Sequence, residues 1–156
     1  MIMKRIVKKI ALIALFTMCA VVETKADSDV YFFIDFWHSS YPIVINGQEA
    51  FTLNPEERTQ IPGGAAVYNM YARKVIFKHP GSYVISVECP TAKGLDKAEQ
   101  NLTIEDGETY YILFNSNIKK SFYSEELTQA AGEKLLKKAQ KSKKYTINED
   151  IVYEGQ

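Results

Sequence analysis

The short stretch from Asp35 to Tyr41 holds the densest set of groups able to do chemistry. It contains a carboxylate, the His38 imidazole, two serine hydroxyls and the rings of Trp37 and Tyr41. A serine nucleophile needs an oriented base and an oxyanion hole, and no Gly-x-Ser-x-Gly turn is present. In a strand, Asp35 and Trp37 share one face and His38 takes the other. We therefore predict no catalytic residue here, and the hypothesis of a small hydrolase using Asp35 and His38 is the alternative.

The same residues suit two other roles. Trp37 and Tyr41 near a loop can stack on a sugar or a peptide, while Asp35 and His38 supply hydrogen bonds. Packing of Trp37 in the core is the simpler interpretation. Asp35, Trp37, His38 and Tyr41 are accordingly the candidate ligand-binding residues.

Metal and thiol chemistry find little support. His38 and His79 are the only imidazoles, and neither has a partner at metal-ligand spacing, so we expect no metal site and no cofactor. Cys89 follows a strand-like run at the parity of its apolar residues, which favours burial as a small hydrophobe.

The N-terminus has the layout of a secretory signal. Four basic residues precede the apolar run 10–22, which is shorter than the roughly 20 residues of a spanning helix. Small residues before Asp27 suit a signal peptidase, so residues 1–26 are predicted to be a signal peptide. Lipidation at Cys19 and an uncleaved anchor are the alternatives. All three export residues 27–156 to the periplasm or cell surface.

Composition places the exported part among ordinary globular domains. The 156 residues are 46% hydrophobic and 12% aromatic, with 19 basic and 19 acidic side chains. After the predicted cleavage, 14 basic residues face 18 acidic ones. An acidic domain gives no electrostatic case for a nucleic-acid partner. We expect a membrane contact only through the signal segment or a lipid anchor.

Short apolar runs separated by Gly, Pro and Asn fill residues 30–115 and are typical of an all-β domain. Asn46-Gly47 predicts a tight type I′ hairpin, and His79-Pro80-Gly81 predicts a second hairpin. Residues 90–100 are polar and suggest a loop, whereas residues 109–114 suggest a central strand. The first run, 30–37, is apolar at both parities, which indicates either a strand covered on both faces or an N-terminal strand packed at a crowded end.

The spacing of the apolar residues changes from a strand-like to a helical period after Asn117. Ser124 is a candidate N-cap, and Leu127, Ala131, Leu135 and Ala139 recur every four residues along one helical stripe. Residues 119–144 carry eight basic and three acidic side chains, while the rest of the exported part carries six and fifteen. The basic surface is formed by Lys134, Lys137, Lys138 and Lys141. A solvated face that shields the domain is the simpler interpretation, and binding of acidic lipid or polymer is the alternative. Residues 145–153 suggest a last strand or a strap.

Three motifs in order resemble a known family. They are Ile43-Val44-Ile45-Asn46-Gly47-Gln48-Glu49, His79-Pro80-Gly81-Ser82-Tyr83-Val84-Ile85-Ser86-Val87 and Asp106-Gly107-Glu108-Thr109-Tyr110-Tyr111-Ile112. This series resembles the exported bacterial domain of unknown function 2846 and related PEGA-like modules. The resemblance implies an immunoglobulin-like or transthyretin-like β-sandwich outside the cytoplasm, and it implies no catalytic site.

The sequence thus predicts a mainly β protein: an antiparallel β-sandwich of seven or eight strands in residues 27–118, with a lysine-rich helix and a C-terminal strap in residues 119–156 packed on the same domain. We expect a non-enzymatic module of the bacterial envelope that binds or scaffolds a protein or carbohydrate partner. A lipid-anchored surface protein attached through Cys19 remains an alternative.

Overall fold

A computed structural model describes residues 26–35, 41–53, 58–60, 66–68, 70–91, 94–115, 122–141, 145–147 and 150–155. The first strands are β1 (Ser28–Asp35), β2 (Tyr41–Ile45), β3 (Gln48–Leu53), β4 (Arg58–Gln60), β5 (Ala66–Tyr68) and β6 (Met70–Phe77). The chain continues through β7 (Gly81–Thr91), β8 (Gly94–Ile104), β9 (Thr109–Asn115), β10 (Tyr123–Glu126), the helix α2 (Gln129–Lys141), β11 (Tyr145–Ile147) and β12 (Ile151–Tyr153).

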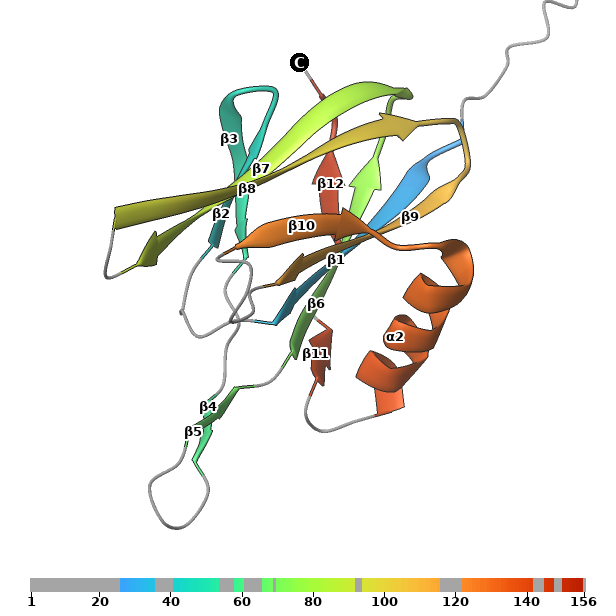
Figure 1. The fold of residues 1–156 in the computed structure, drawn as a ribbon. Coiled ribbons are helices and arrows are strands. Elements are labelled where there is room, and N and C mark those ends of the chain that lie inside the picture. Colours follow the sequence, from blue (N-terminus) through green and yellow to red (C-terminus); the bar gives the residue numbers. More distant parts are fainter. Residues whose placement is uncertain are drawn as a thin grey trace, which may run out of the picture.

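Two packed sheets form the domain, so the predicted mainly β sandwich with a C-terminal helix is confirmed. The larger sheet has the order β10-β9-β1-β6-β11, with β12 also paired to β6, and the smaller has the order β3-β2-β7-β8. In Figure 1, the two-stranded ribbon of β4 and β5 extends away from both sheets. Seven sandwich strands come from residues 28–115, within the predicted number. The sandwich is not wholly antiparallel, because β1 pairs with β9 in parallel and β6 does so with β11 and β12.

Strand β1 lies inside the larger sheet and is covered on both faces, as its apolar residues at both parities predict. Val30, Phe32 and Ile34 face the smaller sheet, whereas Phe33 faces α2, and all four are at most 1% exposed. Alternate residues of a strand point to opposite faces, so the smaller sheet buries one set of β1 side chains and α2 buries the other. This strand therefore connects the two hydrophobic clusters of the domain.

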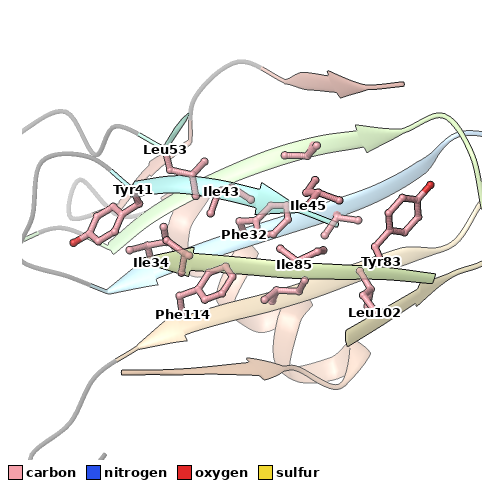
Figure 2. Close-up of a cluster of buried hydrophobic side chains, with 14 of the residues drawn as sticks. Phe32, Ile34, Tyr41, Ile43, Ile45, Leu53, Tyr83, Ile85, Leu102 and Phe114 are labelled. Atoms are coloured by element: carbon pink, nitrogen blue, oxygen red, sulfur yellow. The ribbon is translucent and has the colours of Figure 1, made fainter. Parts of the chain in front are cut away.

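The main core lies between the two sheets. Figure 2 shows Tyr41, Ile34 and Leu53 toward one end and Tyr83 and Leu102 toward the other, with aliphatic side chains and phenylalanine between them. Phe32 stacks on Phe114, with ring centroids 6.1 Å apart. The buried set is aromatic and β-branched, which suits the pleated inner faces of a sandwich.

Helix α2 covers the other face of the larger sheet (Figure 1). The predicted start at Ser124 is wrong: Ser124 belongs to β10, and the helix begins at Gln129, where the Thr128 hydroxyl accepts a hydrogen bond from the Ala131 N–H at 3.4 Å. The predicted stripe is correct except at one position. Leu127, Leu135 and Ala139 pack in the cluster between α2 and the sheet, whereas Ala131 is exposed and Gly132 is buried in its place. A repeat of four residues drifts around a helix of 3.6 residues per turn, which moves Ala131 to the edge of the buried face.

The two predicted hairpins have different outcomes. Asn46 and Gly47 both adopt positive φ, 51° and 83°, and connect paired strands β2 and β3, so the first hairpin is confirmed. The second prediction is wrong, because β6 belongs to the larger sheet and β7 to the smaller. The Pro80-Gly81 turn reverses the chain but carries it from one layer to the other. Turn chemistry fixes a local bend and leaves strand pairing to long-range packing.

The longest ladder of the structure joins β7 and β8, from Gly81↔Ile104 to Thr91↔Gly94. The expectation of a loop over residues 90–100 is therefore wrong. Its polar residues form the second half of a hairpin whose outer face is exposed at Lys97, Glu99 and Asn101. At the C-terminus, β11 and β12 both pair with β6, as the predicted last strand or strap requires.

Candidate binding site

The candidate ligand-binding residues do not form one described surface. Trp37 and His38 lie outside the described residues, and Asp35 ends β1 with a side chain outside them as well. Tyr41 is 0% exposed and belongs to the main core. Its expected role as a surface stacking platform is therefore wrong, because its ring closes one end of the space between the sheets (Figure 2). The hydrolase hypothesis stays a prediction.

One side of the sandwich is closed by a contact between the sheets. Strand β10 ends the larger sheet and β8 ends the smaller sheet. The Ser124 hydroxyl donates a hydrogen bond to the Glu99 carbonyl at 2.6 Å, which joins these two edge strands. The edges of the two sheets that no such contact joins lie on the opposite side of the sandwich.

On that opposite side, a pocket separates the edge strands of the two sheets. Among the described strands, β3 pairs only with β2, and β12 pairs only with β6. The pocket has a volume of about 210 Å³ and is lined by residues 48–50 of β3 and residues 152–155 at the C-terminal strand. The pocket therefore lies between two edge strands. The outward backbone N–H and C=O groups of these strands pair with no other described strand.

An aromatic cluster supports the C-terminal wall of this pocket. Tyr153 packs against Phe77 at a centroid distance of 5.0 Å and against Tyr83 at 6.0 Å. The Lys78 N–H donates to the Tyr153 carbonyl at 3.1 Å, and the Tyr83 hydroxyl donates to the His79 carbonyl at 2.8 Å. Burial raises the pKa of Tyr83, and neighbouring Tyr153 raises it further. These contacts hold the short strand β12 in place.

The pocket presents negative charge beside apolar surface. Glu49 and Glu154 are both exposed on its lining, and the Thr52 hydroxyl donates to Glu49 Oε1 at 3.2 Å. Val152 on the same lining is 51% exposed, an unusual value for a large hydrophobic side chain in this domain. A ligand with an apolar stem and a positive end complements this combination.

A β-bulge gives the β3 wall its shape. The pairing of β2 and β3 shifts between Ile43 and Val44, so that Phe51 and Glu49 oppose consecutive residues of β2 and Ala50 is extra. A bulge bends its strand and redirects side chains, and bulges are frequent at sheet edges. Here the bulged residue itself lines the pocket. The Asn46-Gly47 signal marks the hairpin in the sequence, but nothing in the sequence marks the bulge.

The basic residues predicted from the sequence lie on the exposed side of α2. Lys134, Lys137, Lys138 and Lys141 are all exposed, and the sheet contacts are made by Gly132, Leu135, Leu136 and Ala139 on the other side of the helix. Of these four, Lys138 also interacts with another group of the protein. The four predicted lysines thus lie together on the solvent-exposed face of α2.

The described residues contain no group of three or more His, Cys, Asp or Glu side chains arranged to hold a metal ion. Their helix is also neither long nor apolar enough to cross a membrane.

The fold defines a two-layer β-sandwich with one helix on its outer face. No family model, no curated protein and no solved structure matches the chain. The resemblance to the domain of unknown function 2846 therefore stays a prediction.

Proposed function

We propose that this protein is an exported, non-enzymatic β-sandwich module of the bacterial envelope that binds an extended segment of a partner protein. The binding site is the open side between β3 and β12. The observation that carries the proposal is the pocket between two edge strands of different sheets. Export is supported by the N-terminal sequence pattern and by the three-motif resemblance.

Edge strands favour a peptide as the ligand. An edge presents a row of backbone N–H and C=O groups that an added strand can pair, and alternate side chains of that strand enter neighbouring pockets. The inner faces of both sheets are filled by the main core, and α2 fills the outer face of the larger sheet. Strand addition at β3 or β12 therefore uses surface that the fold leaves available.

The pocket's size and charge indicate what such a peptide carries. Sites for drug-sized ligands usually enclose about 300–1,000 Å³, so a pocket of about 210 Å³ suits one long side chain better. Glu49 and Glu154 favour a positive end group, and Val152 offers contact to an aliphatic stem. Lysine or arginine in an extended segment combines these properties.

Site-specific photocrosslinking in the producing cells tests this proposal. A photoreactive amino acid replaces Val152 in the full-length chain, and the matched control carries it at the exposed Ala131 of α2. We expect an adduct at position 152, absent at position 131, with a peptide that contains lysine or arginine at the crosslinked segment. The double change Glu49→Gln and Glu154→Gln should reduce that adduct.

Two results would contradict the proposal. Equal crosslinking at positions 131 and 152 would show that the pocket selects nothing. An adduct with a glycan in place of a protein would replace the peptide by a carbohydrate partner.

A further inference from the structure

The solvent face of α2 carries three lysines at one side of the helix. Lys134, Lys137 and Lys141 are spaced by three and four residues, so they share one face, and they extend over about 10 Å at 1.5 Å per residue. The helix contacts the sheet through its opposite face, with Gly132 and Ala139 buried. Lys134, Lys137 and Lys141 form no ion pair with any other described residue.

The helix dipole does not account for this arrangement. Basic residues complement the dipole within the last helical turn, and that turn of α2 contains Lys138 and Lys141. Lys134 and Lys137 lie before it. Glu133, the one acidic residue in the α2 sequence, is exposed and accepts a hydrogen bond from Gln129 Nε2 at 3.4 Å.

We propose that this face binds the surface of a membrane that contains anionic phospholipids. The choice of a membrane rests on the export part of the proposed function, since the chain's apolar run 10–22 brings the domain to a membrane during export. The binding itself needs only the lysine face. Because the apolar residues of α2 are packed against the sheet, the contact is electrostatic and reversible, without insertion.

The acidic character of the sandwich does not cancel this attraction. Glu88 on the outer face of the smaller sheet lies on the far side of the sandwich from α2, with both sheets between them. Layer spacings of about 10 Å place its carboxylate roughly 20 Å from the helix, beyond the Debye length of about 8–10 Å at ordinary ionic strength. Glu125 and Glu126 of β10 and Glu133 of α2 are exposed and nearer, but the eight basic residues in 119–144 outnumber these three acidic ones. Screening leaves the near lysines effective and weakens the far carboxylates. The charge asymmetry therefore orients the domain with α2 toward the lipid.

Headgroup quenching measures whether α2 approaches the lipid. A fluorescent amino acid replaces the exposed Ala130 in the full-length protein, and a control carries it at Val84 on the outer face of the smaller sheet. Vesicles of phosphatidylcholine, with or without about one-third phosphatidylglycerol, carry a spin label on the headgroup. We expect the probe at position 130, and not the probe at 84, to be quenched on the anionic vesicles, with loss of quenching at high salt. This readout distinguishes orientation from simple tethering by residues 10–22.

The second part of the test measures how vesicle binding depends on the three lysines. Each surface lysine contributes about fivefold to the binding constant, so Lys134→Gln, Lys137→Gln and Lys141→Gln together should weaken it roughly a hundredfold. Lys78→Gln with Lys97→Gln on the sandwich is the control for removing two of these charges, and should weaken binding far less than Lys134→Gln with Lys137→Gln. Equal quenching on neutral vesicles, or no effect of the triple change, would overturn the proposal. Lysine-dependent binding to soluble polyphosphate without vesicle binding would also overturn it and identify a free polyanion.

The membrane proposal and the peptide proposal can fail independently. The double change Glu49→Gln with Glu154→Gln alters the peptide site and should leave the quenching on vesicles unchanged.

Discussion

The ring of Tyr111 occupies the space that a side chain on Gly132 would need. A Cβ atom at residue 132 would overlap ring atoms of Tyr111 and its Cβ. Tyr111 stacks on Tyr31 at 5.4 Å and on Phe33 at 6.3 Å between ring centroids. The helix can therefore approach the larger sheet this closely only because residue 132 is glycine.

Replacing Gly132 by alanine should destabilise the domain although alanine is the better helix former. The propensity gain is about 1 kcal/mol, whereas overpacking a close contact costs about 1–3 kcal/mol or more. Urea unfolding followed by circular dichroism measures the net loss. Ala131→Gly, at the exposed neighbouring position, should cost only the propensity difference. If the steric account is right, Gly132→Ala will be neutral or stabilising in a Tyr111→Ala background.

The first hairpin offers a cleaner backbone test. Gly47 has φ of 83°, and an added Cβ would meet nothing within 4 Å, so Gly47→Ala introduces backbone strain alone. We expect a loss of about 1–2 kcal/mol in unfolding free energy. Gly47→Asn should cost less, because asparagine tolerates the left-handed region. Equal losses for the two variants would show that the strain is relieved elsewhere, for example at Asn46.

Ser28 secures the start of β1 to the turn between β8 and β9. Its hydroxyl donates to the Glu105 carbonyl at 2.6 Å and accepts from the Gly107 N–H at 3.2 Å, and the residue is 2% exposed. Ser28→Ala leaves both groups without their partner and should cost about 1–3 kcal/mol in denaturant unfolding. Ser82→Ala at an exposed site is the control and should change stability by less than about 0.5 kcal/mol. A neutral Ser28→Ala would mean that water replaces the hydroxyl.

Alkaline pH should weaken the fold through its tyrosines and Lys74. Burial raises the pKa of Tyr111 and of Tyr31. Burial lowers the pKa of Lys74, but its hydrogen bond to Asp29 and the charges of Asp29 and Asp150 raise it by more. In each case the folded state holds its proton to higher pH than the unfolded state. The stability that these protonated groups contribute is fully present below their ordinary pKa values of about 10 to 10.5. It is lost as the pH rises through their pKa values in the folded state.

Denaturant unfolding between about pH 9 and about pH 11.5 should therefore show a falling free energy of unfolding. Tyr111→Phe keeps the ring and removes the ionising group, so it should reduce the slope. An unchanged slope in that variant, together with an unchanged slope in Tyr31→Phe, would assign the alkaline loss to Lys74 or to other groups.

Local patterns predicted the parts of the fold that local chemistry controls. Asn46-Gly47 marks its hairpin because both residues must adopt positive φ. The two-faced burial of β1 follows from apolar residues at both parities. The Pro80-Gly81 turn misled because β6 pairs with β1, β11 and β12 in the larger sheet, whereas β7 pairs with β2 and β8 in the smaller one. The long partner of β7 was missed because its outward face is polar and its inward residues are widely spaced.

The candidate site could be predicted only in part. The lysines of α2 follow from composition and period. The pocket depends on residues 48–50 and 152–155, which are about a hundred positions apart and share no motif. Tyr41 was misplaced because an aromatic residue beside a loop looks the same in sequence whether its ring points outward or into the core.

The position of β1 has a kinetic consequence. This first strand is flanked by β6 and by β9, so Val30 meets Val75 on one side and Tyr110 on the other. During synthesis from the N-terminus, some eighty further residues must follow Val30 before β1 can pair with both of its neighbours. Such high contact order slows folding and leaves aromatic segments open to chaperones and to aggregation in the meantime. The strand order therefore delays completion of the larger sheet until most of the domain has been made.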